Sequence, residues 1–206
     1  MKTLDMALLL IFHPTDFYEE TKLNYQKYSA VPGIILMLLV IAARYIYVLT
    51  VHRPLADIAL ADTNFLLEML RITLPLLTWI VSIYAVTSIL YGETKIKMIF
   101  MSATYSFIPF IVITLLSIPL SHILSLEESG YYYVLQAGMW IWVVLLLFFG
   151  VMLMNNFSFA KTVFVCILSI VGVALIWAAV VMVIALTVQI TGFFNEIIRE
   201  YVIDNL

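Results

Sequence analysis

Residues 134–154, VLQAGMWIWVVLLLFFGVMLM, form an apolar run without a single charged side chain. About 20 apolar residues are what an α-helix needs to cross roughly 30 Å of hydrocarbon. Four further segments have the same character, at 29–49, 72–91, 98–120 and 162–190. In hydrocarbon every backbone polar group must be bonded within its own segment, so each segment is predicted to be a helix. We therefore predict an all-α fold, an integral membrane bundle of five transmembrane helices.

The overall composition supports the same class. Of the 206 residues, 65% are hydrophobic and 11% are charged, and the mean hydropathy is +1.11. An average soluble domain is about 45–50% apolar and about 25% charged, so a soluble enzyme and a disordered regulator are excluded. The formal net charge of −3 provides no basic field for a nucleic-acid partner. The single cysteine, Cys166, excludes an intrachain disulfide framework and a thiolate metal cluster.

Amphipathic segments flank the predicted bundle at both ends of the chain. Phe17, Thr21, Tyr25 and Tyr28 recur at helical spacing, which predicts a helix resting on the lipid headgroups through one face. We expect three regions: N-terminal cytoplasmic interfacial helices in 1–28, including a short one at 3–12; the five-helix membrane domain in 29–192; and a C-terminal amphipathic tail in 193–206.

The distribution of basic residues predicts the orientation. An odd number of spans places the two termini on opposite sides of the cell membrane. The N-terminal side would hold six lysines and the opposite side four arginines, so the positive-inside rule assigns the N-terminus to the cytoplasm and the C-terminus to the outside. The lysines are Lys2, Lys22, Lys27, Lys95, Lys97 and Lys161, and the arginines are Arg44, Arg53, Arg71 and Arg199.

Arg44 is the only charged residue inside a predicted span. A charge at the centre of a bilayer costs at least a few kcal/mol, which makes an intramembrane charge a candidate for function. Arg44 lies about four residues from the outer end of its span, from where its long stem could also reach the interface. An outer carboxylate such as Asp57 or Glu68 is the expected partner.

Catalytic and metal-binding patterns are weak. None of His13, His52 and His122 shows the i, i+4 spacing of a helical zinc site. The spans contain no ionised acid–base pair of the kind that proton transport or intramembrane catalysis needs. We therefore assign no catalytic residue, cofactor or metal, and expect that the protein is not an enzyme.

Proline and small residues indicate how the spans pack. Pro109 lies in the middle of the third span and is predicted to kink it. Small residues recur at a spacing of four, which allows helices to approach closely, within this chain or against another membrane protein. These pairs are Thr78 and Ser82, Ser102 and Ser106, and Ala174 and Ala178.

Three motifs resemble a known family of five-span membrane proteins. They are FHPTDFY at 12–18, YGETKIK at 91–97 with YSFIP at 105–109, and NNFSFAKT at 155–162. Over most of 10–190 the chain is similar to bacterial members of the Yip family, named for interacting with Ypt/Rab GTPases. The resemblance implies a cytoplasmic N-terminus, two related hairpins with Lys-bearing cytoplasmic turns, and no catalysis. Eukaryotic relatives carry a longer N-terminal region, so the short one here argues against GTPase binding.

The leading hypothesis is a non-enzymatic integral membrane protein that scaffolds or regulates membrane partners. Its partners would be membrane lipids and other integral membrane proteins. The candidate partner and lipid face consists of Phe17, Tyr25, Tyr28, Lys95, Lys97, Asn156, Phe157 and Lys161.

Three alternatives remain open. The chain could be an accessory subunit of a membrane transport complex, such as an ABC-type transporter. It could be a membrane enzyme in which His52 and His122 converge with outer carboxylates. It could also be a small channel or lipid-handling protein, with a polar path lined by Thr78, Ser82, Thr87, Ser102, Ser106 and Asn155.

Overall fold

A computed structural model describes residue 10 and residues 13–23, 30–52 and 64–204, with the backbone alone for 195–204. All the regular elements in these residues are helices, which confirms the all-α fold. They are α2 (Pro14–Leu23), α3 (Val31–Thr50), α4 (Phe65–Ile89), α5 (Ile96–Tyr105), α6 (Ile108–Ile123), the short 3₁₀ helix η3 (Leu126–Glu128), α7 (Ser129–Met154) and α8 (Phe159–Asp204).

Five helical segments within the described residues are long and apolar enough to cross a membrane, as the sequence predicts. They are Val31–Thr50, Phe65–Ile89, Ile96–Ile123, Ser129–Met154 and Phe159–Phe194. The second begins earlier than expected, because the side chain of Asn64 caps it by accepting a hydrogen bond from the amide of Leu66 (2.9 Å).

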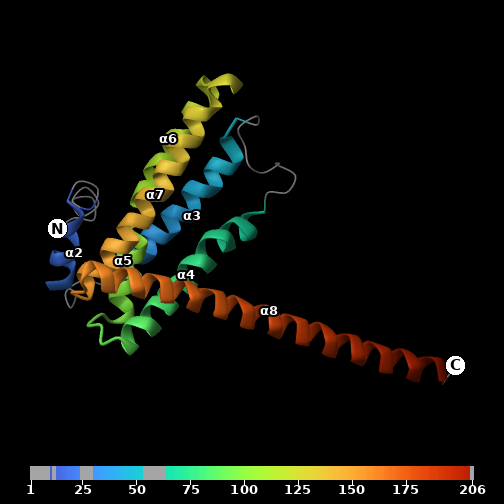
Figure 1. Cartoon of the computed structure of the whole chain (residues 1–206). Coiled ribbons are helices and arrows are strands. Elements are labelled where there is room, and N and C mark those ends of the chain that lie inside the picture. Colours follow the sequence, from blue (N-terminus) through green and yellow to red (C-terminus); the bar gives the residue numbers. More distant parts are fainter. Residues whose placement is uncertain (1–9, 11–12, 24–29, 53–63, 205–206) are drawn as a thin grey trace.

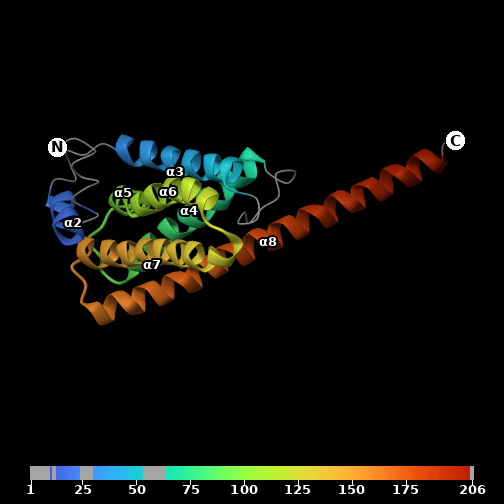
Figure 2. The same cartoon turned by 90° about the horizontal axis from the view of Figure 1, so that it is seen from above.

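The helices define two ends of the molecule (Figures 1 and 2). The turns at 90–95 and 155–158 join α4 to α5 and α7 to α8, and α2 lies beside them; we call this the turn end. The C-terminus of α3 and the N-termini of α4 and α7 lie at the opposite end, which we call the loop end.

The third span is broken into α5 and α6 at Ser106 and Phe107. Pro109 lies at the start of α6, where its missing N–H and its fixed φ are tolerated, whereas inside a continuous helix they would not be. The predicted kink at Pro109 is therefore confirmed as a break between two helices. Ser106 at this break is completely buried.

Helix α2 packs against the bundle instead of resting on headgroups, which corrects the expectation for 1–28. Phe17, Tyr18 and Thr21 are 1%, 0% and 2% exposed, and the first two belong to a core cluster with residues of α5 and α7. The helix has the predicted apolar face, but other helices of the protein cover this face, whereas we expected lipid headgroups to cover it. The expected helix at 3–12 lies outside the described residues apart from Leu10.

Helix α8 is a single helix from Phe159 to Asp204, so the amphipathic tail expected at 193–206 continues this helix as far as residue 204, and 205–206 lie outside the described residues. Its first half packs closely on α4, where the hydroxyl of Ser82 donates to the carbonyl of Ser169 (2.7 Å) and a Cβ at Gly172 would overlap that hydroxyl. From residue 177 to residue 194 every side chain is exposed, and this part of α8 extends away from the other helices (Figures 1 and 2).

Candidate functional site

Both hairpins turn with the same backbone motif at the turn end. The amides of Gly92 and Phe157 each donate to the carbonyl five residues earlier, at 2.7 and 3.0 Å. The residues before them, Tyr91 and Asn156, have φ values of 56° and 53°. This is the Schellman arrangement, in which a left-handed residue ends a helix. Its repetition is consistent with two related hairpins.

Asn155 connects the two turns. Its side-chain carbonyl accepts hydrogen bonds from the hydroxyl of Thr94 (2.6 Å) and from the amide of Thr94 (3.4 Å), and its NH₂ group donates to the carbonyl of Val151 (2.9 Å). Asn155 and Thr94 are both buried. Buried polar groups bonded in this way specify one register of the turns, because any shift would leave them without partners.

Exposed groups surround this connection. The carboxylate of Glu93 accepts from the ammonium of Lys22 in α2 (3.0 Å) and from the side-chain NH₂ group of Asn156 (3.1 Å). The ammonium of Lys161 donates to the carbonyl of Leu90 (3.0 Å) and lies 3.8 Å from the ring centroid of Phe157. We name the following residues the turn-end cluster: Lys22, Glu93, Thr94, Asn155, Asn156 and Lys161.

Tyr18 anchors α2 to the break in the third span. Its hydroxyl donates to the carbonyl of Leu146 (2.8 Å) and shares a hydrogen bond with the hydroxyl of Ser106 (2.9 Å). Burial raises the pKa of the Tyr18 phenol well above its usual value, and the hydrogen bonds to serine hydroxyls offset this only in part. Tyr18 therefore acts as a neutral anchor. The sequence does not reveal this role of Tyr18, because its partner Ser106 lies 88 residues away in the chain.

The structure gathers part of the predicted partner and lipid face at the turn end. Lys95, Lys97 and Asn156 are exposed there and Lys161 is partly exposed. Phe17 and Phe157 are 1% and 8% exposed, so they belong to the interior and do not form an open surface. The remaining two predicted residues, Tyr25 and Tyr28, lie outside the described residues.

At the loop end, Arg44 pairs with Glu68, one of its two expected partners. The Nε of Arg44 donates to one carboxylate oxygen of Glu68 (3.1 Å), and Arg71 binds the other oxygen (2.5 Å). The Glu68 side chain is only 2% exposed, so it is a helix residue inside the bundle and not the outer-loop carboxylate that we expected. The three charges sum to +1. Asp57, the other expected partner, lies outside the described residues.

A pocket of about 120 Å³ lies beside Arg44, between α3, α6 and α7. The guanidinium of Arg44 lies 5.3 Å from the ring centroid of Tyr47, and the hydroxyls of Tyr47 and Tyr132 are hydrogen-bonded to each other (2.5 Å). Gln136 donates to Ser117 (2.9 Å). We name this the loop-end pocket; the lining residues used below are Arg44, Tyr47, Tyr132, Tyr133, Gln136 and Trp140. Gln136 is a polar amide within the uncharged apolar run 134–154, and this contrast is the signal of the pocket that the sequence contains.

The two loop-end histidines converge, as the enzyme alternative requires. The ring centroids of His52 and His122 are 5.5 Å apart, and the Nε2 of His122 is bonded to the carbonyl of Thr50 (2.9 Å). Both side chains are exposed. Among the described residues, no group of three or more His, Cys, Asp or Glu side chains is placed to hold a metal ion.

The hydroxyls that would line a channel are used in helix packing. The side chains of Ser82, Thr87, Ser102 and Ser106 are buried. Thr87 donates to a carbonyl one turn earlier in its own helix (2.7 Å), and the hydroxyl of Ser106 is bonded to that of Tyr18 at the break (2.9 Å). The exposed hydroxyl of Thr78 donates one turn back in the same way as Thr87 (3.0 Å). This arrangement argues against a polar path through the described part of the bundle.

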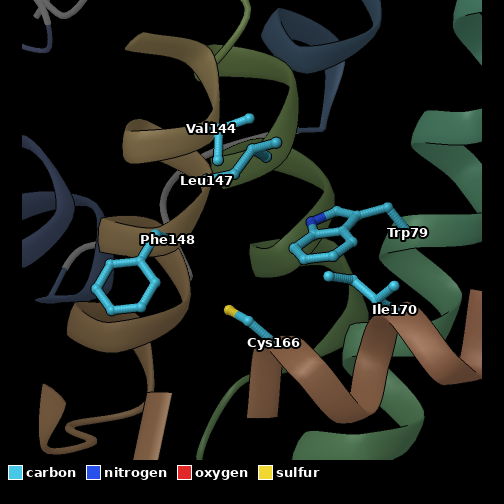
Figure 3. A pocket seen from close by; sticks show the side chains of 6 residues that line it. All are labelled: Trp79, Val144, Leu147, Phe148, Cys166 and Ile170. Atoms are coloured by element: carbon cyan, nitrogen blue, oxygen red, sulfur yellow. The ribbon is translucent and has the colours of Figure 1, made fainter. Parts of the chain in front are cut away.

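An apolar pocket of about 290 Å³ opens where α8 separates from α7 (Figure 3). Trp79 of α4 closes one side. The other lining residues belong to α7 and α8: Val144, Leu147, Phe148, Cys166 and Ile170. Such a surface accommodates an acyl chain or an apolar side chain, and offers a polar ligand nothing to bind.

The fold and these sites describe an α-helical protein with five segments able to span a membrane. Comparisons with protein-family models, with curated proteins and with solved structures found no match to this chain.

Proposed function

We propose that this protein is a non-enzymatic integral membrane scaffold of Yip-like architecture that holds another integral membrane protein along α8. The supporting observation is the apolar length of α8 that the bundle leaves uncovered. The stretch Phe159–Phe194 has 36 residues and is long and apolar enough to span a membrane. In the 18-residue apolar window of this stretch, only 6% of the residues are buried by the rest of the protein.

The length of this stretch exceeds what lipid alone covers. At about 1.5 Å per residue, 36 residues extend about 54 Å, against about 30 Å of hydrocarbon. Keeping all of it in hydrocarbon requires a tilt of about 56°, beyond the observed range of about 0–40°. A partner that packs along residues 177–194 removes this mismatch, since protein then covers the apolar side chains that lipid does not reach.

The proposed orientation puts the turn end in the cytoplasm, with its exposed lysines facing anionic headgroups, each contributing about 1 kcal/mol of attraction. The accessory-subunit alternative differs only in the identity of the partner, which would be a permease or an ATPase subunit.

Photocrosslinking in native membranes tests the proposal. A photoreactive residue is placed at each position from 177 to 190, with lipid-facing Leu116 of α6 as the matched control, because it is 59% exposed but outside α8. We expect adducts to a different integral membrane protein, with yields that recur every three to four residues along one helix face. Uniform yields around α8 equal to those at Leu116, or adducts that contain only second copies of this chain, would contradict the proposal.

A further inference from the structure

We infer that the loop-end pocket binds the phosphate group of an anionic phospholipid, with Arg44 as the phosphate ligand. This inference does not depend on a docking partner at α8. It rests on the charge, the aromatic lining and the open side of the pocket.

The charge balance favours an anion. Both carboxylate oxygens of Glu68 are occupied, one by Arg44 and one by Arg71. In the described part of the chain, the hydrogen bond found for Arg44 uses Nε alone, which leaves the two terminal nitrogens of its guanidinium for a ligand. Arg44 lines the pocket with 22% of its side chain exposed, and within the described residues the charges of Arg44, Arg71 and Glu68 together leave one positive charge beside it.

The geometry favours phosphate over a simple monovalent ion. A guanidinium offers parallel N–H donors that match two oxygens of one phosphate group. The ring of Tyr47 holds the guanidinium from one side. Gln136 donates one hydrogen bond to Ser117, and its NH₂ group carries a second proton that can reach a bound oxygen.

The open side of the pocket favours a lipid over free phosphate. Trp140 and Tyr133 line it and are 47% and 52% exposed, so they form an apolar exit toward the hydrocarbon. Trp and Tyr are the side chains enriched at the level of the headgroups. A phospholipid can therefore place its phosphate at Arg44 while its acyl chain lies over Trp140.

Quenching of Trp140 by brominated lipids tests the inference. The full-length protein with Trp79, Trp142 and Trp177 changed to Phe retains only Trp140, and is reconstituted in phosphatidylcholine with small amounts of brominated phosphatidylglycerol or brominated phosphatidylcholine. We expect phosphatidylglycerol to be preferred by about fivefold, because a net charge of one near a membrane surface contributes about 1 kcal/mol of attraction to an anionic headgroup. A matched protein that retains only Trp142, which is 43% exposed on the same helix, should show no preference.

Substitutions at Arg44 identify the ligand group. Arg44→Gln should abolish the headgroup preference, and Arg44→Lys should retain a weaker one because it keeps the charge and loses the paired donors. Equal quenching by the two lipids, or a preference that persists in Arg44→Gln, overturns the inference. Relief of quenching by millimolar inorganic phosphate would assign the site to free phosphate and overturn the lipid assignment. The comparison of Trp140 with Trp142 keeps Arg44 intact, so the inference stays testable even if Arg44→Gln does not fold.

Discussion

Tyr18→Phe should weaken the docking of α2 on the bundle without unfolding the other helices. The substitution keeps the aromatic ring, which packs edge-on against Phe17 with centroids 5.1 Å apart, and removes only the hydroxyl. That hydroxyl bonds the carbonyl of Leu146 and the hydroxyl of Ser106, both inside the bundle. Each such bond contributes about 0.5–1.5 kcal/mol net, so the docking free energy of α2 should fall by about 1–3 kcal/mol.

The assay measures how often α2 opens. Thr21, 2% exposed on the docked face of α2, is changed to Cys in a Cys166→Ser background, and its alkylation rate by a maleimide is followed in detergent micelles. A loss of 1–3 kcal/mol in local stability corresponds to about 5- to 150-fold faster labelling. Tyr91→Phe is the matched control, because the Tyr91 side chain is 93% exposed and its hydroxyl should contribute nothing to docking.

The pH dependence of the same assay follows from the raised pKa of Tyr18. The folded-state pKa lies above the unfolded value of 10.0, so the neutral anchor contributes its full stability below about pH 10 and loses it as the pH rises further. Labelling should therefore accelerate above about pH 10 in the parent protein more than in the Tyr18→Phe variant. Equal labelling rates of Tyr18→Phe, Tyr91→Phe and the parent at neutral pH would refute the reasoning that the hydroxyl docks α2.

Three further substitutions test the turn end and the loop end by unfolding in mixed detergent micelles. Glu68→Ala should lower the free energy of unfolding by about 3–5 kcal/mol, because it leaves Arg44 without its carboxylate. Glu127→Ala, at an exposed carboxylate, should change it little, and equal effects of the two substitutions would argue against the buried pair. Tyr91→Gly should stabilise the protein by about 1 kcal/mol, because φ at this residue is 56°, and a destabilised variant would argue against strain at that turn. Asn155→Ala should lower the free energy of unfolding by about 1–3 kcal/mol, because it removes the side-chain partner of buried Thr94 in the other turn, and a neutral result would show that the turns are not coupled.

Local physics made much of the fold predictable from the sequence. The five spans follow from apolar length alone, since hydrocarbon leaves the backbone no alternative to a helix. The break in the third span follows from Pro109, because proline lacks the N–H that a continuous helix requires. The pairing of Arg44 with Glu68 was one of two expected choices, because a charge within a span needs an opposite charge nearby.

The sites depended on contacts between residues far apart in the chain. From the sequence, Glu68 was expected in an outer loop. In the structure, the cap at Asn64 starts α4 before Glu68, and the buried carboxylate binds Arg44 and Arg71. Tyr132, Gln136 and Trp140 share one face of α7 at helical spacing, but the loop-end pocket forms only where α3, with Arg44 and Tyr47, and α6 meet that face.

The sequence by itself determined that the chain forms five apolar helices, because burial in hydrocarbon and the length of a helix are properties of each segment alone. Only the tertiary structure decided which faces protein covers. It brings Tyr18 to the break at Ser106, joins the turns through Asn155 and leaves the second half of α8 exposed. An apolar side chain is about as stable against lipid as against another helix. Hydropathy therefore does not distinguish lipid-facing from helix-facing residues, whereas packing geometry does.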